Sequence, residues 1–182
     1  MHISLDGFVA KKNGELDWFE NVDEHLSFLN ELLPSADSIM LGRVTYEMFN
    51  NHWPSIETNP IASVDEKKYS QWYNNVTKIV LSKTLRELKE KKAILVENNS
   101  ISTIKTLKTQ PGKDILLFGS PTVGQLLAQE NLIDEYLIFI NPAVFGTGIP
   151  MFNTNTNLTR LKLLETKTIS NGEVALRYEV KK

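Results

Sequence analysis

The sequence predicts an α/β fold with a mostly parallel sheet, helices on both faces of that sheet and an antiparallel hairpin at one edge. Short apolar runs typical of strands alternate with longer segments of helical periodicity along most of the chain. The most apolar run, at 114–118, has the character of a central strand. Asn171 and Gly172 separate two strand-like segments near the end, which is a strong hairpin signal.

The expected strands are short and rich in β-branched and apolar residues. The first is very brief and is closed by the Asp6–Gly7 turn, and the others have the run length of roughly four to eight residues that favours buried strands. We expect strands at 3–5, 38–41, 76–81, 93–96, 114–118, 135–140, 161–166 and 174–180.

The expected helices carry apolar residues at helical spacing. We expect helices at 23–33, 43–49, 65–74, 101–107 and 121–127. Asp23 is a candidate N-cap for the first helix, and Pro34 ends it. Ser120 is a candidate N-cap for the last helix, with Pro121 in its first turn.

Length and composition indicate one domain over residues 1–182. A chain of 182 residues with 41% hydrophobic residues can bury a sizeable core without disulfides or a structural metal. It contains no cysteine, which excludes a disulfide scaffold, a thiolate zinc site, an iron–sulfur cluster and a cysteine nucleophile. The three histidines are scattered singly, so we expect no metal site.

Charge and hydropathy exclude several classes of partner. Twenty basic and 22 acidic residues give a formal net charge of −2 without a basic patch, so we expect neither nucleic acid nor a membrane as a partner. The start of the chain has no apolar stretch typical of a secretion signal, and no run approaches the roughly 20 residues that span a bilayer. We therefore expect a cytoplasmic protein that acts on a small molecule.

Three strand ends carry the residues best suited to bind phosphate. Each is followed by small residues, hydroxyls or a cation: Gly42, Arg43 and Thr45; Ser82 and Thr84; Gly119, Ser120, Pro121 and Thr122. Open α/β sheets bind ligands at the carboxyl ends of their strands, where helix N-termini attract anions. A dinucleotide fits this pattern, although each segment alone is also consistent with an ordinary strand-to-helix turn.

Other motifs give weaker or negative signals. The segment 119–126 lacks the Lys-Ser/Thr of a P-loop, and 146–150 lacks the third glycine of a dinucleotide-binding fingerprint. No Gly-x-Ser-x-Gly nucleophile elbow is present. Trp18, Phe19 and Trp53, the last in an expected loop over 50–60, could line a substrate pocket or pack in the core.

Several short motifs, in this order, resemble bacterial proteins of the dihydrofolate reductase family with a RibD C-terminal-like domain. They are Ser-Leu-Asp-Gly-Phe-Val-Ala at 4–10, Gly-Arg-Val-Thr-Tyr-Glu at 42–47, Val-Leu-Ser-Lys-Thr at 80–84, Gly-Ser-Pro-Thr at 119–122, Leu-Ile-Asp-Glu-Tyr at 132–136 and the segment 142–152. The resemblance covers nearly the whole chain.

The resemblance implies a three-layer α/β/α fold like that of dihydrofolate reductase, with NADPH along the carboxyl ends of the strands. Gly42, Arg43 and Thr45 would meet the phosphates of the cofactor, Ser82 and Thr84 would lie on its adenosine side, and the segment 119–122 would hold the pyrophosphate. Asp6 would face the substrate with Trp18 and Phe19, and it is the candidate for proton supply. A homodimer is also expected from the resemblance.

We therefore expect an enzyme, an NADPH-dependent reductase of a small heterocyclic, carbonyl or imine substrate. It resembles the 5-amino-6-(5-phosphoribosylamino)uracil reductase of riboflavin biosynthesis, although we expect no separate deaminase domain within residues 1–182. A pterin or folate reductase is a weaker alternative, because Leu26, Leu29 and Leu33 of the first helix point inward where folate reduction needs a carboxylate. A non-catalytic NADP(H)-binding protein and a plain interaction domain stay open.

Overall fold

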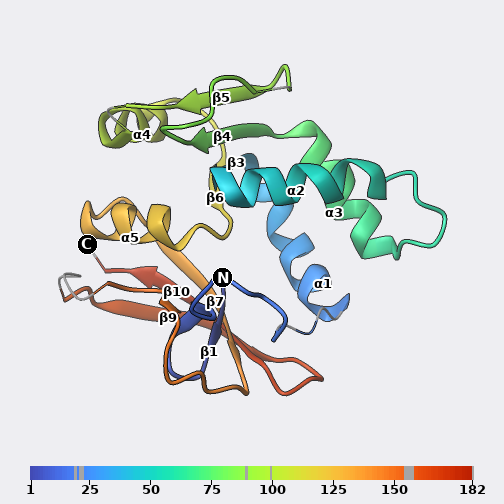
Figure 1. Cartoon of the computed structure of the whole chain (residues 1–182), viewed down its shortest axis with the longest axis vertical. Coiled ribbons are helices and arrows are strands. Elements are labelled where there is room, and N and C mark those ends of the chain that lie inside the picture. Colours follow the sequence, from blue (N-terminus) through green and yellow to red (C-terminus); the bar gives the residue numbers. More distant parts are fainter. Residues whose placement is uncertain (19, 21–22, 89, 99, 154–157, 182) are drawn as a thin grey trace. The chain divides into compact units, whose positions relative to one another are not determined.

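A computed structural model describes residues 1–18, 20, 23–88, 90–98, 100–153 and 158–181 (Figure 1). The chain divides into two compact units, one formed by Met1–Val22 with Pro121–Lys182 and the other by Asp23–Ser120. The predicted α/β class is confirmed, with a parallel sheet in one unit and an antiparallel hairpin in the other. The single domain over 1–182 stays a prediction.

The unit Asp23–Ser120 is built around four parallel strands. Its strands are β3 (Ala36–Gly42), β4 (Thr77–Leu81), β5 (Ala93–Val96) and β6 (Asp114–Leu117). Its helices are α1 (Asp23–Leu32), the 3₁₀ turn η1 (Leu33–Ser35), α2 (Arg43–Ile56), α3 (Val64–Asn75) and α4 (Ser100–Thr109).

The strand order β5-β4-β3-β6 places β3 in the interior of this sheet. Gly42 at the end of β3 pairs with Leu81 at the end of β4, and Met40 pairs with Leu117 at the end of β6. Because all four strands run in parallel, their carboxyl ends lie at one edge of the sheet. Helix α2 follows Gly42 directly, so its first turn begins between the ends of β4 and β6.

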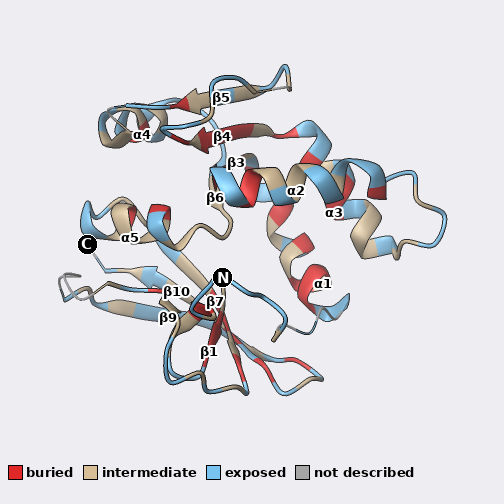
Figure 2. Ribbon diagram, in the orientation of Figure 1, coloured by how far each residue is buried: buried red, intermediate tan, exposed pale blue. Residues whose placement is uncertain are grey.

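The main hydrophobic core of this unit packs α1, α2 and α3 against β3 and β4. Ile39, Leu41 and Val80 of the strands are fully shielded from solvent, and Tyr69 and Tyr73 of α3 are equally buried (Figure 2). Burial raises the pKa of both tyrosines, since the charged phenolate would lose its hydration. Aromatic rings therefore supply much of the apolar area that holds α3 to the sheet.

A buried lysine closes the carboxyl end of α3. The Lys78 ammonium donates a hydrogen bond of 2.5 Å to the carbonyl of Tyr73 and lies 4.6 Å from the centre of the Tyr73 ring. A cation at the negative end of a helix satisfies a carbonyl that has no partner within the helix. Burial lowers the pKa of Lys78, because desolvation disfavours the charged form.

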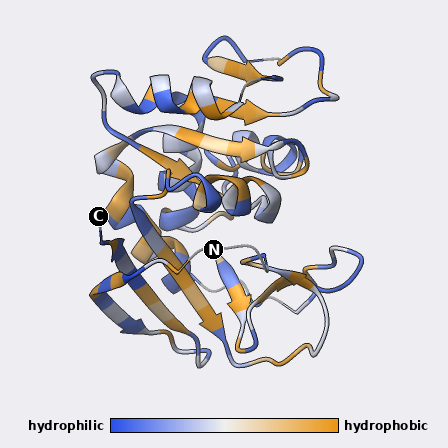
Figure 3. Ribbon diagram, turned by 90° about the vertical axis from the view of Figure 1, so that its left-hand side faces the viewer, coloured by the Kyte–Doolittle hydropathy of each residue, from blue (hydrophilic) through white to orange (hydrophobic). Residues whose placement is uncertain are grey.

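The unit Met1–Val22 with Pro121–Lys182 contains a mixed sheet of order β1-β7-β10-β9. Its elements are β1 (His2–Ser4), β2 (Phe8–Ala10), α5 (Pro121–Gln129), β7 (Glu135–Asn141), β8 (Ile149–Pro150), β9 (Leu161–Thr168) and β10 (Val174–Val180). Strand β1 runs parallel to β7, and β10 runs antiparallel to both β7 and β9. Much of the hydrophobic sequence in both units lies on the strands (Figure 3).

The hairpin predicted at Asn171 and Gly172 is confirmed. The two residues lie in the turn between β9 and β10, where Gly172 has a φ of 89° that glycine adopts without strain. Strands β2 and β8, which pair with each other, are not among the expected elements. With three and two residues, they are too short to show the alternation that marks a strand.

The prediction of a loop over 50–60 is wrong in its first half, because α2 continues through Pro54 to Ile56. The hydroxyl of the fully buried Ser70 accepts a hydrogen bond from the Glu57 amide at 2.9 Å and donates one to the Trp53 carbonyl at 2.6 Å. The Ser70 side chain thus links α3 to the last turn of α2. Trp53 lies on this helix, and the centre of its ring is 4.3 Å from that of Tyr69. Of its two expected roles, core packing and lining a substrate pocket, it therefore has the first.

No helix among the described residues is both long and apolar enough to cross a membrane.

We expect the substitution Ser70→Ala to lower the free energy of unfolding by about 1–3 kcal/mol, since it removes a fully buried hydroxyl and leaves the Glu57 amide and the Trp53 carbonyl without their partner. Ser55→Ala is the matched control, because the exposed Ser55 hydroxyl bonds one carbonyl within α2 and its loss should change stability by less than about 0.5 kcal/mol. Urea unfolding of both variants measures the difference. Equal losses would contradict the role given to Ser70.

Candidate functional site

Seven of the predicted site residues lie together at the carboxyl edge of the parallel sheet. These residues are Gly42, Arg43, Thr45, Ser82, Thr84, Gly119 and Ser120. The Ser82 amide donates to the Val96 carbonyl of β5 at 3.1 Å, and the Phe118 amide donates to the Met40 carbonyl of β3 at 3.1 Å. These bonds extend the sheet by one residue past β4 and β6 and fix where the following loops begin.

The first turn of α2 has the features of an anion-binding site. Gly42 is its N-cap in an extended conformation, so the N-cap residue supplies no side-chain hydrogen bond to the first amides of this 14-residue helix. Arg43, a cation, occupies the first position, where the helix dipole favours an anion. Uncapped amides and a guanidinium at the same helix start are poor for helix stability and well suited to a phosphate.

Arg43 keeps most of its hydrogen-bonding capacity. Its Nη1 donates to Glu47 Oε2 at 2.7 Å, four residues along the same helix. Among the described residues this is its one hydrogen bond, and a guanidinium carries five N–H groups. The remaining donors can bind a ligand oxygen.

Thr45 fixes the loop that follows β6. A Cβ on Gly119 would lie 3.0 Å from both Oγ1 and Cγ2 of the buried Thr45, so the backbone of Gly119 rests directly on this side chain. Gly119 and Ser120 both adopt left-handed conformations, with φ of 55° and 50°. Such a conformation strains a non-glycine residue, and strain of this kind concentrates at functional sites.

The expected N-cap role of Ser120 is wrong in its geometry. Helix α5 does begin at Pro121, as predicted, but an N-cap residue normally has extended backbone angles, and Ser120 has a positive φ. Pro121 and the exposed Thr122 belong to the other compact unit.

Ser82 organises the loop after β4. Its buried hydroxyl oxygen accepts hydrogen bonds from the amides of Thr84 at 3.1 Å and Leu85 at 2.9 Å. The Thr84 hydroxyl lies 3.4 Å from the same oxygen, and the Thr84 side chain is exposed. Ser82 therefore holds the turn, and Thr84 is the hydroxyl that a ligand can reach.

One contact of this edge has no signal in the sequence. The hydroxyl of the buried Tyr46 donates to Glu90 Oε2 at 2.6 Å, which joins the first turn of α2 to the long loop between β4 and β5. A hydrogen bond to a carboxylate is among the stronger kinds in proteins. The 44 positions that separate the two residues leave no local pattern from which to predict it.

Asp6, the predicted substrate-end carboxylate, holds a loop in the other unit. It accepts hydrogen bonds from the Ser4 hydroxyl at 2.6 Å and from the amides of Phe145 at 3.1 Å and Gly146 at 2.7 Å. The Ser4 hydrogen bond, with help from the two amides, holds the pKa of Asp6 below its usual value. A carboxylate that is ionised and already accepting several hydrogen bonds is better suited to positioning than to proton donation.

The loop held by Asp6 presents an aromatic cluster. The centre of the Phe145 ring lies 5.0 Å from that of the Trp18 ring, in an edge-to-face arrangement, and 6.5 Å from that of the Phe8 ring, in a stacked arrangement. Trp18 is thus packed against another ring of its own unit. Phe19 lies outside the described residues.

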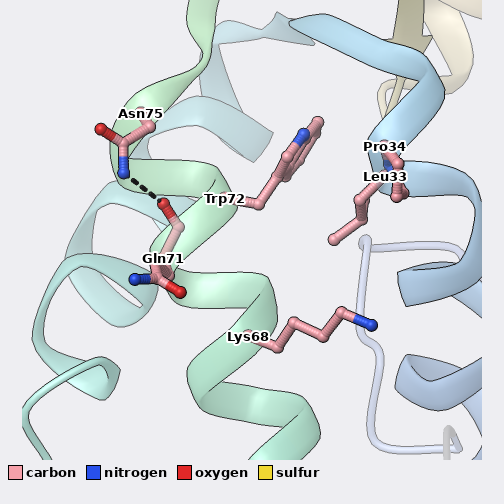
Figure 4. Close-up of a pocket in the computed structure, with 6 residues that line it drawn as sticks. All are labelled: Leu33, Pro34, Lys68, Gln71, Trp72 and Asn75. Carbon is pink, nitrogen blue, oxygen red and sulfur yellow. Dashed lines mark hydrogen bonds between the residues drawn. The ribbon is translucent and has the colours of Figure 1, made fainter.

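A surface hollow of about 290 Å³ lies elsewhere on the unit Asp23–Ser120, between α3 and η1 (Figure 4). Trp72 and Leu33 face each other across it, and the Trp72 indole donates to the carbonyl of Ala36, the first residue of β3, at 3.3 Å. The hollow therefore lies at the amino end of β3 and includes none of the predicted site residues.

We expect the stabilising effect of Asp6 to depend on pH. Its folded pKa lies below the unfolded value of about 3.8, so the effect is complete above that value and is lost as pH falls through the folded pKa. Unfolding of the wild type and Asp6→Asn from about pH 7 to pH 3 should show a difference in stability that shrinks toward acid pH. Ser4→Ala, which removes a donor to Asp6, should shift this titration to higher pH. A difference that does not vary with pH would contradict the assignment.

Gly119→Ala should lower the free energy of unfolding by more than the roughly 1–2 kcal/mol that a left-handed alanine costs, because the new methyl group also meets Thr45. Gly14→Ala is the control, since Gly14 has a φ of 88° and a methyl group added there would meet no atom within 4 Å. Thr45→Ser should recover part of the loss in the Gly119→Ala background. Equal losses at positions 14 and 119 would mean that the contact with Thr45 is unimportant.

The chain matches known proteins over nearly its whole length. A family model of the RibD C-terminal domain matches residues 1–175. The uncharacterized protein YyaP of Bacillus subtilis (strain 168) is 32% identical over 176 residues, which cover 97% of this chain and 90% of that protein. A solved structure from Shewanella sp. PV-4, named for riboflavin biosynthesis, is 25% identical with a TM-score of 0.72 and covers 100% of this chain and 97% of that one.

The fold also resembles that of a dihydrofolate reductase. The Enterococcus faecalis enzyme, solved as a complex with NADP(H), has a TM-score of 0.64 at 13% identity, with 100% of this chain and 94% of that chain covered. This likeness confirms the predicted dihydrofolate-reductase-like fold. The family model, which matches residues 1–175, shows that the chain belongs to the RibD C-terminal domain family.

Proposed function

We propose that this chain is an NADPH-dependent oxidoreductase that reduces a small heterocyclic, carbonyl or imine substrate. The observation that carries the proposal is the uncapped start of α2, which places Arg43 and free amides between the loops that follow β4 and β6. This donor set suits a ligand with several phosphates, as a dinucleotide has. The family of the chain supports an oxidoreductase.

The residues of the edge divide between holding and contacting the cofactor. Arg43 and the first amides of α2 would bind a phosphate, and Thr84 would lie on the adenosine side. The left-handed turn at Gly119 and Ser120 would present its backbone to the pyrophosphate, with Pro121 and Thr122 next in the chain. Gly42, Thr45 and Ser82 would act by shaping the loops. The bound nicotinamide supplies the hydride, and the protein supplies orientation and a water-poor environment.

For the substrate, we propose a planar nitrogen heterocycle related to the pyrimidine that the riboflavin-pathway reductase reduces. The Shewanella relative is named for riboflavin biosynthesis, the pathway of that reductase. Trp18 offers an aromatic surface suited to a planar ring. Asp6 would act by holding the Phe145 loop and not as the proton donor.

Helix α1 disfavours folate as the substrate. Its buried side chains are His25, Leu26, Phe28 and Asn30, so no carboxylate of this helix is buried where folate reduction would need one. The substrate-end residues, a cytoplasmic location and a homodimer stay predictions.

Titration of the purified protein with NADPH, followed by nicotinamide fluorescence, tests the cofactor. We expect saturable binding, and the absence of binding at up to about 1 mM would overturn the proposal. Arg43→Ala should weaken NADPH binding by about 10- to 100-fold, the effect of losing a charge-assisted hydrogen bond. Arg177→Ala is the matched control and should leave binding unchanged. It removes an arginine that pairs with Glu135 within the mixed sheet of the other unit.

The same titration with NADH shows which phosphate Arg43 meets. A larger loss for NADPH than for NADH places Arg43 on the 2′-phosphate, whereas an equal loss places it on the pyrophosphate. Oxidation of NADPH with a panel of pyrimidines, pterins and quinones then identifies the substrate class. Binding without oxidation of NADPH by any of them would favour a non-catalytic NADP(H)-binding protein.

A further inference from the structure

Glu47 lies beside the cation that the proposed function assigns to a phosphate. Its Oε2 is 2.7 Å from Nη1 of Arg43, and the two side chains are 44% and 43% exposed. The exposure means that a ligand can reach the guanidinium from solvent without unfolding any part of the unit. It also means that the ion pair is accessible to competition.

The ion pair has little value for the stability of α2. Exposed ion pairs contribute weakly, and an arginine that precedes a glutamate by four residues has the less favourable order along a helix. The cation is also placed at the positive end of the helix dipole. Local stability therefore does not explain why Arg43 and Glu47 occupy these positions.

We propose that Glu47 is a specificity-determining residue that competes with the phosphate of the ligand for the Arg43 guanidinium. This inference rests on the proposed function. Without a ligand, the Glu47 carboxylate pairs with Arg43 and offsets its charge. When a phosphate binds, it must displace the carboxylate or share the guanidinium with it, and the repulsion between the two anions lowers its affinity.

The consequence is that Glu47 sets a threshold for the charge of the ligand. A dianionic 2′-phosphate competes with a single carboxylate better than a neutral hydroxyl or a monoanionic carboxylate can. Small monovalent anions are therefore bound more weakly at Arg43 than a strongly charged phosphate is. Removal of the Glu47 charge should increase affinity for phosphate ligands, an effect that structural damage does not produce.

Glu47→Gln is the test variant, because glutamine keeps the length of the side chain and an oxygen that can accept from Arg43. We expect Glu47→Gln to tighten NADPH binding by about two- to five-fold at low salt, the range of an exposed charge pair, and to lose this gain as salt rises. Glu31→Gln is the matched control, since Glu31 is an exposed glutamate of α1, near the amino end of β3. It should leave the affinity unchanged.

A double-mutant cycle locates the effect. In the Arg43→Ala background, Glu47→Gln should no longer tighten binding, because there is no guanidinium to compete for. The inference is overturned if Glu47→Gln weakens or does not change NADPH binding, or if it tightens binding equally in the Arg43→Ala background. Absence of NADPH binding to the wild type would overturn the proposed function itself and this inference with it.

Discussion

The interior position of β3 in the parallel sheet is the constraint on which the candidate site depends. With β4 on one side and β6 on the other, the chain that leaves β3 must begin its helix between the loops that leave its neighbours. Three adjacent residues of α2 use this position differently. Thr45 supports Gly119 after β6, Tyr46 bonds Glu90 in the loop after β4, and Glu47 pairs with Arg43. One helical turn thus connects the loops that follow β4 and β6.

Polar residues that look alike in the sequence have different tasks in the structure. Ser82 and Asp6 are both plausible ligand-binding residues by type, yet each uses its oxygen to hold backbone amides of a nearby loop. Arg43 and Thr84 keep donors that face solvent. A backbone amide that is not in regular structure still needs an acceptor, and the nearest serine or aspartate commonly supplies it. Residues that hold the loops therefore alternate, along the same segments, with residues whose donors can bind a ligand.

The sequence was sufficient for features with local signals and insufficient for those without them. Apolar periodicity predicted the long helices and strands, and the Asn171–Gly172 turn predicted the hairpin. The loop predicted over 50–60 missed the end of α2, because the Ser70 hydroxyl that bonds Trp53 and Glu57 comes from another helix and is remote in sequence. The positive φ of Ser120 and the Tyr46–Glu90 hydrogen bond are likewise set by tertiary packing. The grouping of strand-end residues was predictable, because parallel strands bring their ends to one edge.

Three local conflicts in the unit Asp23–Ser120 lie at that edge. At the two ends of α3 the local choices favour folding: Ser63 and Glu66 form a reciprocal capping box at its start, and Lys78 satisfies a carbonyl at its end. At the carboxyl edge, α2 begins with a glycine that gives no side-chain cap and a cation at the wrong end of the dipole, and Ser120 adopts a strained conformation. Sequences tend to be locally consistent except where function requires otherwise. A bound polyanion would resolve the first two conflicts together, because it would accept from the free amides and neutralise Arg43.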